Sequence, residues 1–177
     1  MRVGMVASGA LRTNRIGTEV RILKKLRNWA TLDANARWLT IAAAVLPIAI
    51  SAGFRCVGVA RTQGYLRAWA SAGKGSQSSA GATELIRSAR RALRIVRTNT
   101  GIQGTCLTRS MALWAALLRL GVATDLRFGI RKRAGFIEGH AWVEHQGFPI
   151  NDTRDLIGTY EVYPHSAAFD EWARSRK

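Results

Sequence analysis

The spacing of the apolar residues changes abruptly near Gly121, and this change constrains the fold more than any other feature of the chain. Over residues 105–120 the apolar side chains recur at helical spacing, which predicts an amphipathic helix. Over 122–130 apolar residues alternate with polar ones or glycine, which is typical of a β-strand, and shorter strands are predicted at 137–144 and 148–152. We therefore expect a helix followed by an antiparallel sheet, an α+β fold. The residues that define the helical apolar face are Leu107, Met111, Trp114 and Leu118.

The residues before this helix are predicted to form a helical N-terminal region. A 17-residue uncharged run over 38–54 fits a buried or interfacial helix pair, broken near Pro47, better than a membrane span. A Ser- and Gly-rich segment at 71–83 has the composition of a linker. We therefore expect two parts, a helical region over 1–83 that ends in this linker and a second domain over 84–177.

Positive charge is concentrated in the first 100 residues. They carry 17 Lys and Arg against 3 Asp and Glu, which is a net charge of +14, whereas residues 101–177 carry 10 against 8. Such a field favours an anionic partner, although arginines on solvated helix faces would explain it equally well. A helix predicted over 83–97 displays much of this charge, and we regard three of its arginines as a candidate surface for docking a substrate or partner. They are Arg87, Arg90 and Arg94.

The chain has only two cysteines, Cys56 and Cys106. This number excludes a disulfide framework and fits a reducing compartment, so we expect a cytoplasmic protein. No zinc-ligand spacing is present, and neither a metal nor another cofactor is expected. Cys56 has no histidine nearby in the sequence and is predicted to be a core residue.

Cys106 begins the predicted helix, and His140 and Asp152 follow it on predicted strands. A helix N-terminus favours a thiolate through its dipole, and its free N–H groups suit a developing oxyanion. A histidine is the usual base for such a nucleophile, and a carboxylate orients the imidazole. Each residue alone would more often be structural, but the three together favour a Cys-His-Asp catalytic triad. Gln103, in the preceding loop, is a candidate oxyanion donor.

The spacing of the last two strands also predicts how His140 and Asp152 meet. The segment His145-Gln146-Gly147 fits a three-residue hairpin loop with Gly147 in the left-handed conformation. This loop would place His140 directly opposite Asp152, with their Cβ atoms about 5 Å apart on one face of the sheet.

Four segments of the second half are together similar to a known enzyme family. They are Thr105-Cys-Leu-Thr-Arg-Ser-Met-Ala-Leu-Trp114, Arg127-Phe-Gly-Ile-Arg131, Phe136-Ile-Glu-Gly-His-Ala-Trp-Val-Glu144 and Ile150-Asn-Asp152. Over about residues 100–155 the chain resembles the transglutaminase-like cysteine proteases of lasso-peptide biosynthesis. The resemblance implies a papain/transglutaminase-like core over 84–177, and it places the family's catalytic residues at Cys106, His140 and Asp152.

The resemblance also implies a function and partners. In that family the enzyme removes the leader from a ribosomally made precursor, a winged-helix module captures the leader, and a separate ATP-dependent cyclase closes the freed core peptide. Residues 1–100 contain no hairpin-rich stretch for a wing, so the chain resembles the stand-alone peptidase of a split system. We therefore expect a leader-specific cysteine endopeptidase of peptide maturation that works through an acyl-enzyme. Its expected partners are the precursor leader and a separate winged-helix recognition protein, with the cyclase as a further candidate.

Two other functions stay open at this point. A transglutaminase-type acyltransferase would use the same triad with an amine as the acceptor. A basic protein that binds nucleic acid or a membrane surface, with an inactive site, is the alternative from another class. The sequence lacks aromatic residues interleaved with basic ones, so we expect no nucleic-acid partner, while peripheral membrane contact by residues 38–54 stays open.

Overall fold

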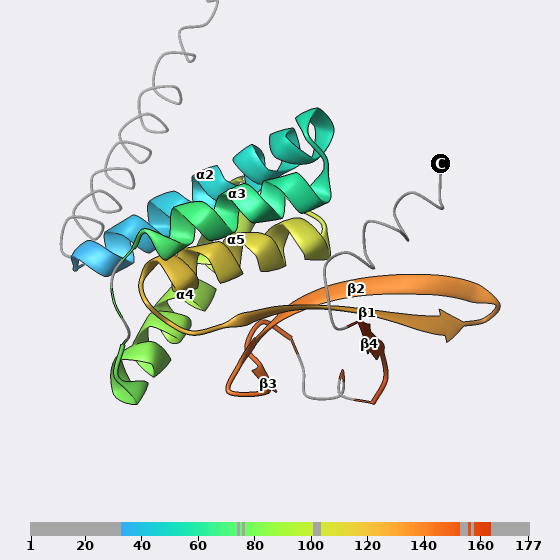
Figure 1. Cartoon of the computed structure of the whole chain (residues 1–177). Coiled ribbons are helices and arrows are strands. Elements are labelled where there is room, and N and C mark those ends of the chain that lie inside the picture. Colours follow the sequence, from blue (N-terminus) through green and yellow to red (C-terminus); the bar gives the residue numbers. More distant parts are fainter. Residues whose placement is uncertain are drawn as a thin grey trace, which may run out of the picture. The chain divides into compact units, whose positions relative to one another are not determined.

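A computed structural model describes residues 33–73, 75, 77–100, 104–152, 156 and 158–163. The chain divides into two units, Met1–Arg37 and Trp38–Lys177. Of the first unit only residues 33–37 are described, where the Asp33 carboxylate accepts a hydrogen bond of 2.8 Å from the N–H of Ala36. In the described residues helices precede strands (Figure 1), which confirms the predicted α+β class. The elements are α2 (Ala34–Cys56), α3 (Val59–Ser71), α4 (Ser79–Thr100), α5 (Cys106–Arg119), β1 (Asp125–Arg133), β2 (Phe136–His145), β3 (Phe148–Pro149) and β4 (Glu161–Tyr163).

The sheet is antiparallel, with the strand order β3-β2-β1-β4. β1 and β2 form a long hairpin in which Gly129 lies opposite His140. Its tight turn contains Ala134 and Gly135, both at positive φ. β4 pairs with the other edge of β1, where Gly129 lies opposite Val162. β4, which follows the segment that carries Asp152, was not among the strands predicted from the sequence.

The turn between β2 and β3 is shorter by one residue than predicted. Glu144 pairs with Pro149 and His145 pairs with Phe148, so only Gln146 and Gly147 form the turn. Both adopt positive φ, 52° and 79°, as two-residue turns that match the twist of the strands require. The prediction allowed positive φ only at Gly147. The predicted pairing of His140 with Asp152 is therefore wrong, and the third strand ends at Pro149 rather than at residue 152.

α5 is the helix that the apolar spacing predicted over 105–120, and it is the central element of the fold. It packs against α3, α4 and the sheet, and nearly all of its residues from Leu107 to Leu117 are buried, with Arg109 exposed. The β2 side chains that share its apolar clusters are Ala141 and Val143. Burial of each large apolar side chain contributes about 1.5–3 kcal/mol to stability, so packing in the core fixes the position of α5. Because side chains alternate along a strand, His140 and Trp142 lie on the opposite face of β2.

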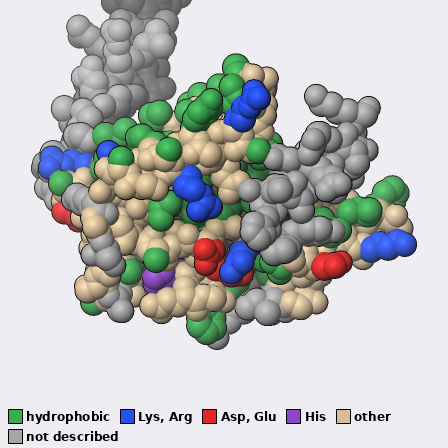
Figure 2. Space-filling view, in the orientation of Figure 1, with side chains coloured by type: hydrophobic (Ala, Val, Ile, Leu, Met, Phe, Trp, Pro, Cys, Tyr) green, Lys and Arg blue, Asp and Glu red, His purple; other side chains and the backbone are tan. Residues whose placement is uncertain are grey.

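α2 runs without a break through Pro47, so the predicted interruption is wrong. Proline removes one main-chain hydrogen bond, but a continuous buried face keeps the helix together, and the Ser51 hydroxyl donates to the Pro47 carbonyl at 2.7 Å. Apolar side chains also gather on the outer surface of α2 and α3 (Figure 2). Among the described helices, α2 alone is long and apolar enough to cross a membrane, a criterion that core helices of soluble proteins also meet. Its buried residues are Leu39, Ala42, Ala43, Pro47 and Ile50.

The Ser- and Gly-rich segment at 71–83 is partly helical, because α4 begins at Ser79. Gln77 fastens this segment to the end of α5. Its side-chain amide donates to the Leu120 carbonyl at 2.9 Å, and its N–H donates to the Gly121 carbonyl at 3.1 Å. The division of the chain into domains near residue 83 stays a prediction.

Candidate active site

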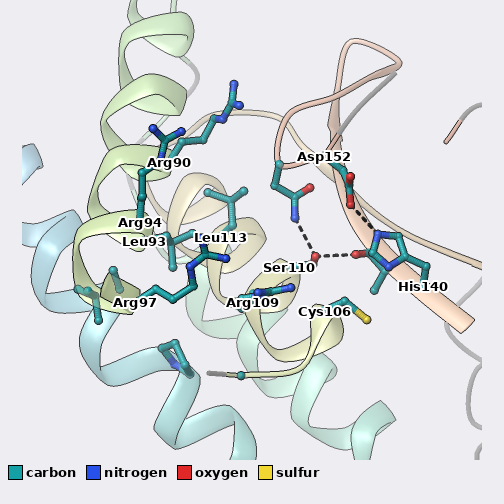
Figure 3. A pocket seen from close by; sticks show the side chains of 16 residues that line it. Arg90, Leu93, Arg94, Arg97, Cys106, Arg109, Ser110, Leu113, His140 and Asp152 are labelled. Carbon is teal, nitrogen blue, oxygen red and sulfur yellow. Dashed lines mark hydrogen bonds and ion pairs between the residues drawn. The ribbon is translucent and has the colours of Figure 1, made fainter. Parts of the chain in front are cut away.

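A pocket of about 370 Å³ lies between α2, α4, α5 and β2. All three residues of the predicted triad line it: Cys106 from the first turn of α5, His140 from β2, and Asp152 from the segment after β3. In Figure 3 the Cys106 side chain projects towards the side of the pocket that His140 and Asp152 occupy. The fold therefore brings together residues that are separated by up to 46 positions in the sequence.

Cys106 owes its position to the capped start of α5. Thr105 is the N-cap, and its hydroxyl accepts a hydrogen bond of 3.2 Å from the N–H of Thr108. The first N–H groups of any helix have no backbone partner within the helix. The cap takes the N–H of Thr108, and the N–H groups of Cys106 and Leu107 belong to the same first turn. Cys106 is a free, partly buried thiol beside these donors, an arrangement that suits attack on a carbonyl and stabilisation of the resulting oxyanion.

His140 and Asp152 are in direct contact. His140 Nε2 lies 2.6 Å from Asp152 Oδ2. The His140 side chain is half-buried, with 21% of its surface exposed, whereas Asp152 lies at the surface. An ionised Asp152 accepts the proton on Nε2, and this contact leaves Nδ1 as the basic nitrogen of a neutral imidazole. The structure thus joins the two residues as the triad requires, although they are not a pair in the sheet.

Asn151 explains how Asp152 reaches His140 after β3 has ended. The Asn151 side-chain oxygen accepts from the N–H of Val143 at 2.8 Å, so an amide side chain continues the hydrogen bonding of the sheet. Asn151 Nδ2 donates to the Ser110 hydroxyl at 2.9 Å, and that hydroxyl donates to the Ala141 carbonyl at 2.8 Å. These bonds connect α5, β2 and the Asp152 segment beside the pocket.

The His140 ring is held by aromatic neighbours on the outer face of β2. Its centroid lies 6.1 Å from that of Trp142 and 5.4 Å from that of Tyr160. Trp142 is fixed in turn, because its Nε1 donates to Glu144 at 2.8 Å and Arg127 pairs with the same carboxylate at 2.9 Å. The imidazole is therefore oriented by packing as well as by Asp152.

Tyr160 provides evidence of the electrostatic surroundings of this cluster. Burial raises the pKa of Tyr160 above its ordinary value of 10.0, whereas Arg131, whose guanidinium lies 4.7 Å from the ring centroid, lowers it. Negative charge on Glu138, Asp152 and Cys106 raises the pKa further. The Tyr160 phenol thus lies close enough to the Asp152 carboxylate and to Cys106 for their charges to act on it.

The other residues that the sequence analysis singled out lie in different places in the structure. Arg90 and Arg94 line the pocket, whereas Arg87 does not and forms an ion pair with Glu84. Gln103 lies outside the described residues, and its role as an oxyanion donor stays a prediction. Cys56 is exposed at the last position of α2, so its prediction as a core residue is wrong. Within the described part of the chain, no group of three or more His, Cys, Asp or Glu side chains is arranged to hold a metal ion.

Five residues of this site were not proposed as functional from the sequence. Arg97 and Arg109 line the pocket, Ser110 and Asn151 form the hydrogen-bonded bridge, and Tyr160 packs on His140. Helical spacing would have identified two of them, because Arg109 and Ser110 follow Cys106 by three and four positions and share its side of α5. No comparable local pattern precedes Tyr160.

Comparison with known proteins identifies a family. The family model described as the transglutaminase-like superfamily matches residues 44–164, which is more than half of the chain. The matched span begins inside α2, ends just after β4 and includes every residue of the described pocket except Ala43. No curated protein and no solved structure matches the chain.

Proposed function

The chain belongs to the transglutaminase-like superfamily, and on this premise we propose that it is a cysteine peptidase that removes the leader from a lasso-peptide precursor. The observation that carries the proposal is the joint placement of three groups in one pocket. Cys106 starts a buried helix there, and the His140 imidazole lies 2.6 Å from Asp152 in the same pocket. Superfamily membership itself is compatible with both proteolysis and acyl transfer.

The proposed reaction has two halves, acylation of Cys106 and hydrolysis of the resulting thioester, and His140 moves a proton in each. His140 Nδ1 takes the Cys106 thiol proton, and the sulfur attacks the scissile carbonyl carbon to form a tetrahedral oxyanion. N–H groups at the start of α5 stabilise this oxyanion. The C–N bond then breaks as His140 returns the proton to the leaving amine. Water, activated by the same imidazole, hydrolyses the thioester and frees the thiol, while Asp152 keeps the ring oriented throughout.

The assignment to lasso-peptide maturation rests on the sequence segments around these residues. The runs Thr105–Trp114 and Phe136–Glu144 resemble those of the leader peptidases. We propose that the chain acts in the cytoplasm as the stand-alone peptidase of a split system. A separate winged-helix protein would present the leader, and the cyclase would take over the freed α-amine.

The test is an incubation of the whole protein with a candidate precursor and its winged-helix recognition protein, followed by intact-mass analysis. Two products whose masses sum to that of the precursor plus one water indicate hydrolysis. A product that combines the acyl fragment with an added amine indicates acyl transfer instead. An intact precursor in the presence of the recognition protein would overturn the proposal, provided that Cys106 of the same sample still reacts with iodoacetamide.

A further inference from the structure

One wall of the pocket is strongly basic. Three arginines of α4 and one of α5 line it, all of them exposed. In Figure 3 the three arginines of α4 lie across the pocket from His140 and Asp152, and the arginine of α5 lies beside Cys106. Among the described lining residues, Asp152 is the one acid, and it is already in contact with His140. The four basic residues are Arg90, Arg94, Arg97 and Arg109.

Among the described residues these four arginines form no ion pair, unlike the other arginines near the site. Arg127 pairs with Glu144, and Arg131 pairs with Glu138. Four like charges on one concave surface, with Asp152 as the single described acid, repel one another and attract an anionic ligand. Guanidinium groups are well suited to carboxylates because they donate two parallel hydrogen bonds.

The spacing of the arginines suits an extended peptide. Arg90 and Arg94 are one turn apart, which is about 6 Å along a helix. Alternate side chains of an extended chain are about 6.6 Å apart, so acidic residues at alternate positions would meet successive arginines. Between them Leu93 and Leu113 add an apolar floor, which would contact the aliphatic parts of the substrate.

On the basis of the proposed function, we propose that this wall selects substrates with Asp or Glu side chains close to the scissile bond. The acidic side chains would pair with Arg90, Arg94 and Arg97, while Arg109 holds the chain beside Cys106. A peptide fits this pocket better than a nucleic acid, because the described lining contains no Phe, Tyr or Trp on which a base could stack.

The first experiment measures the field at Cys106 without any peptide. In the Cys56→Ser protein, Cys106 is alkylated with neutral iodoacetamide and with anionic iodoacetate, and the ratio of the two rates is recorded. In each reaction the sulfur forms a bond to carbon and iodide leaves. We expect the Arg94→Glu/Arg97→Glu variant to lower the iodoacetate-to-iodoacetamide ratio about tenfold. The matched control is Arg91→Glu. It reverses an exposed charge on the same helix, α4, but outside the pocket lining, and it should leave the ratio nearly unchanged.

The second experiment tests peptides by their protection of Cys106 from iodoacetamide. The probes are two short peptides that differ only in having Glu or Gln at alternate positions, and a third with Lys. The Glu peptide should protect the unaltered pocket and the Gln peptide should not. The Arg94→Glu/Arg97→Glu variant should lose this preference and gain protection by the Lys peptide, which a purely structural role of the arginines would not produce.

The outcomes separate this inference from the proposed function. If the Glu and Gln peptides protect Cys106 equally, or if neither protects it, the inference is overturned even when the precursor is cleaved. Protection by a single-stranded oligonucleotide but not by the Glu peptide would also overturn it, in favour of nucleic-acid binding. A clear preference for Glu together with an uncleaved precursor would retain the acidic-peptide pocket and remove the peptidase proposal.

Discussion

Asn151 donates a hydrogen bond of 2.9 Å to the Ser110 hydroxyl, and this bond joins α5 to the segment that carries Asp152. Ser110 lies one helical turn after Cys106, and Asn151 directly precedes Asp152. Ser110 also donates to the carbonyl of Ala141, the residue that follows His140. A single pair of side chains therefore fixes the relative position of all three proposed catalytic residues.

We expect Ser110→Ala to lower activity through this bridge. The substitution leaves Asn151 Nδ2 and the Ala141 carbonyl without their partner in a buried site, which costs about 1–3 kcal/mol of stability. At a temperature where the variant is folded, kcat should fall while the rate of Cys106 alkylation changes little, because the thiol itself is untouched. Ser110→Thr, which keeps a hydroxyl, is the conservative comparison. Wild-type kcat in Ser110→Ala would show that the bridge does not position the triad.

The two cysteines should behave differently on substitution. Cys106→Ala removes the proposed nucleophile and is expected to abolish leader removal, as judged by intact mass. Cys56→Ala changes an exposed residue at the end of α2 and should retain full activity, so it serves as the matched control. Leader removal by the Cys106→Ala protein at the wild-type rate would exclude the cysteine mechanism.

His140 and Asp152 should contribute unequally to the rate. His140→Ala removes the proposed base and should be nearly inactive. Asp152→Ala keeps the base, and the ring still packs on Trp142 and Tyr160, so we expect a smaller loss of kcat/KM. The measurement is kcat/KM of both variants with the partner-bound precursor. A loss in Asp152→Ala as large as that in His140→Ala, or larger, would contradict the idea that packing helps to orient the imidazole.

Sequence patterns predicted the parts of this fold that depend on local periodicity. The apolar face of α5 and the alternation in β1 and β2 identified these elements to within a few residues, because burial on one face imposes a period that a short window reveals. The order Cys106, His140, Asp152 then singled out the residues that line one pocket.

The remaining features depend on contacts that no local pattern shows. The turn at Gln146 and Gly147 differs from the prediction by one residue, since a glutamine at positive φ has no clear sequence signal. β4 is only three residues long, and its pairing with β1 is a long-range contact. Pro47 suggested a helix break, but the packing of α2 on the core keeps the helix continuous.

Gly129 is expected to be sensitive to the smallest enlargement. A Cβ at this position would lie 2.8 Å from Tyr160 Cβ and 2.9 Å from Trp142 Cη2, so the aromatic cluster around His140 would have to move. We expect Gly129→Ala to cost about 1–3 kcal/mol of stability through overpacking and to lower kcat. Gly64→Ala in α3, where a Cβ meets nothing within 4 Å, is the matched control, and it should be neutral or slightly stabilising. Urea unfolding and kinetics measure both effects, and equal behaviour of the two variants would contradict the crowding.

Tyr160 should make the stability of the protein depend on pH in the alkaline range. Burial raises the pKa of Tyr160 in the folded state above its ordinary value of 10.0. Below that value the phenol is protonated in both the folded and the unfolded state, so it contributes no pH dependence.

Above pH 10.0 the unfolded chain loses the Tyr160 proton before the folded protein does. The unfolded state then binds fewer protons, and the free energy of unfolding falls as the pH rises. Urea unfolding of the wild type and of Tyr160→Phe, on both sides of pH 10.0, isolates this effect because the other tyrosines are common to both proteins. The wild type should lose stability more steeply than Tyr160→Phe above pH 10.0, and identical slopes would show that the phenol is no harder to ionise in the folded protein than in the unfolded chain.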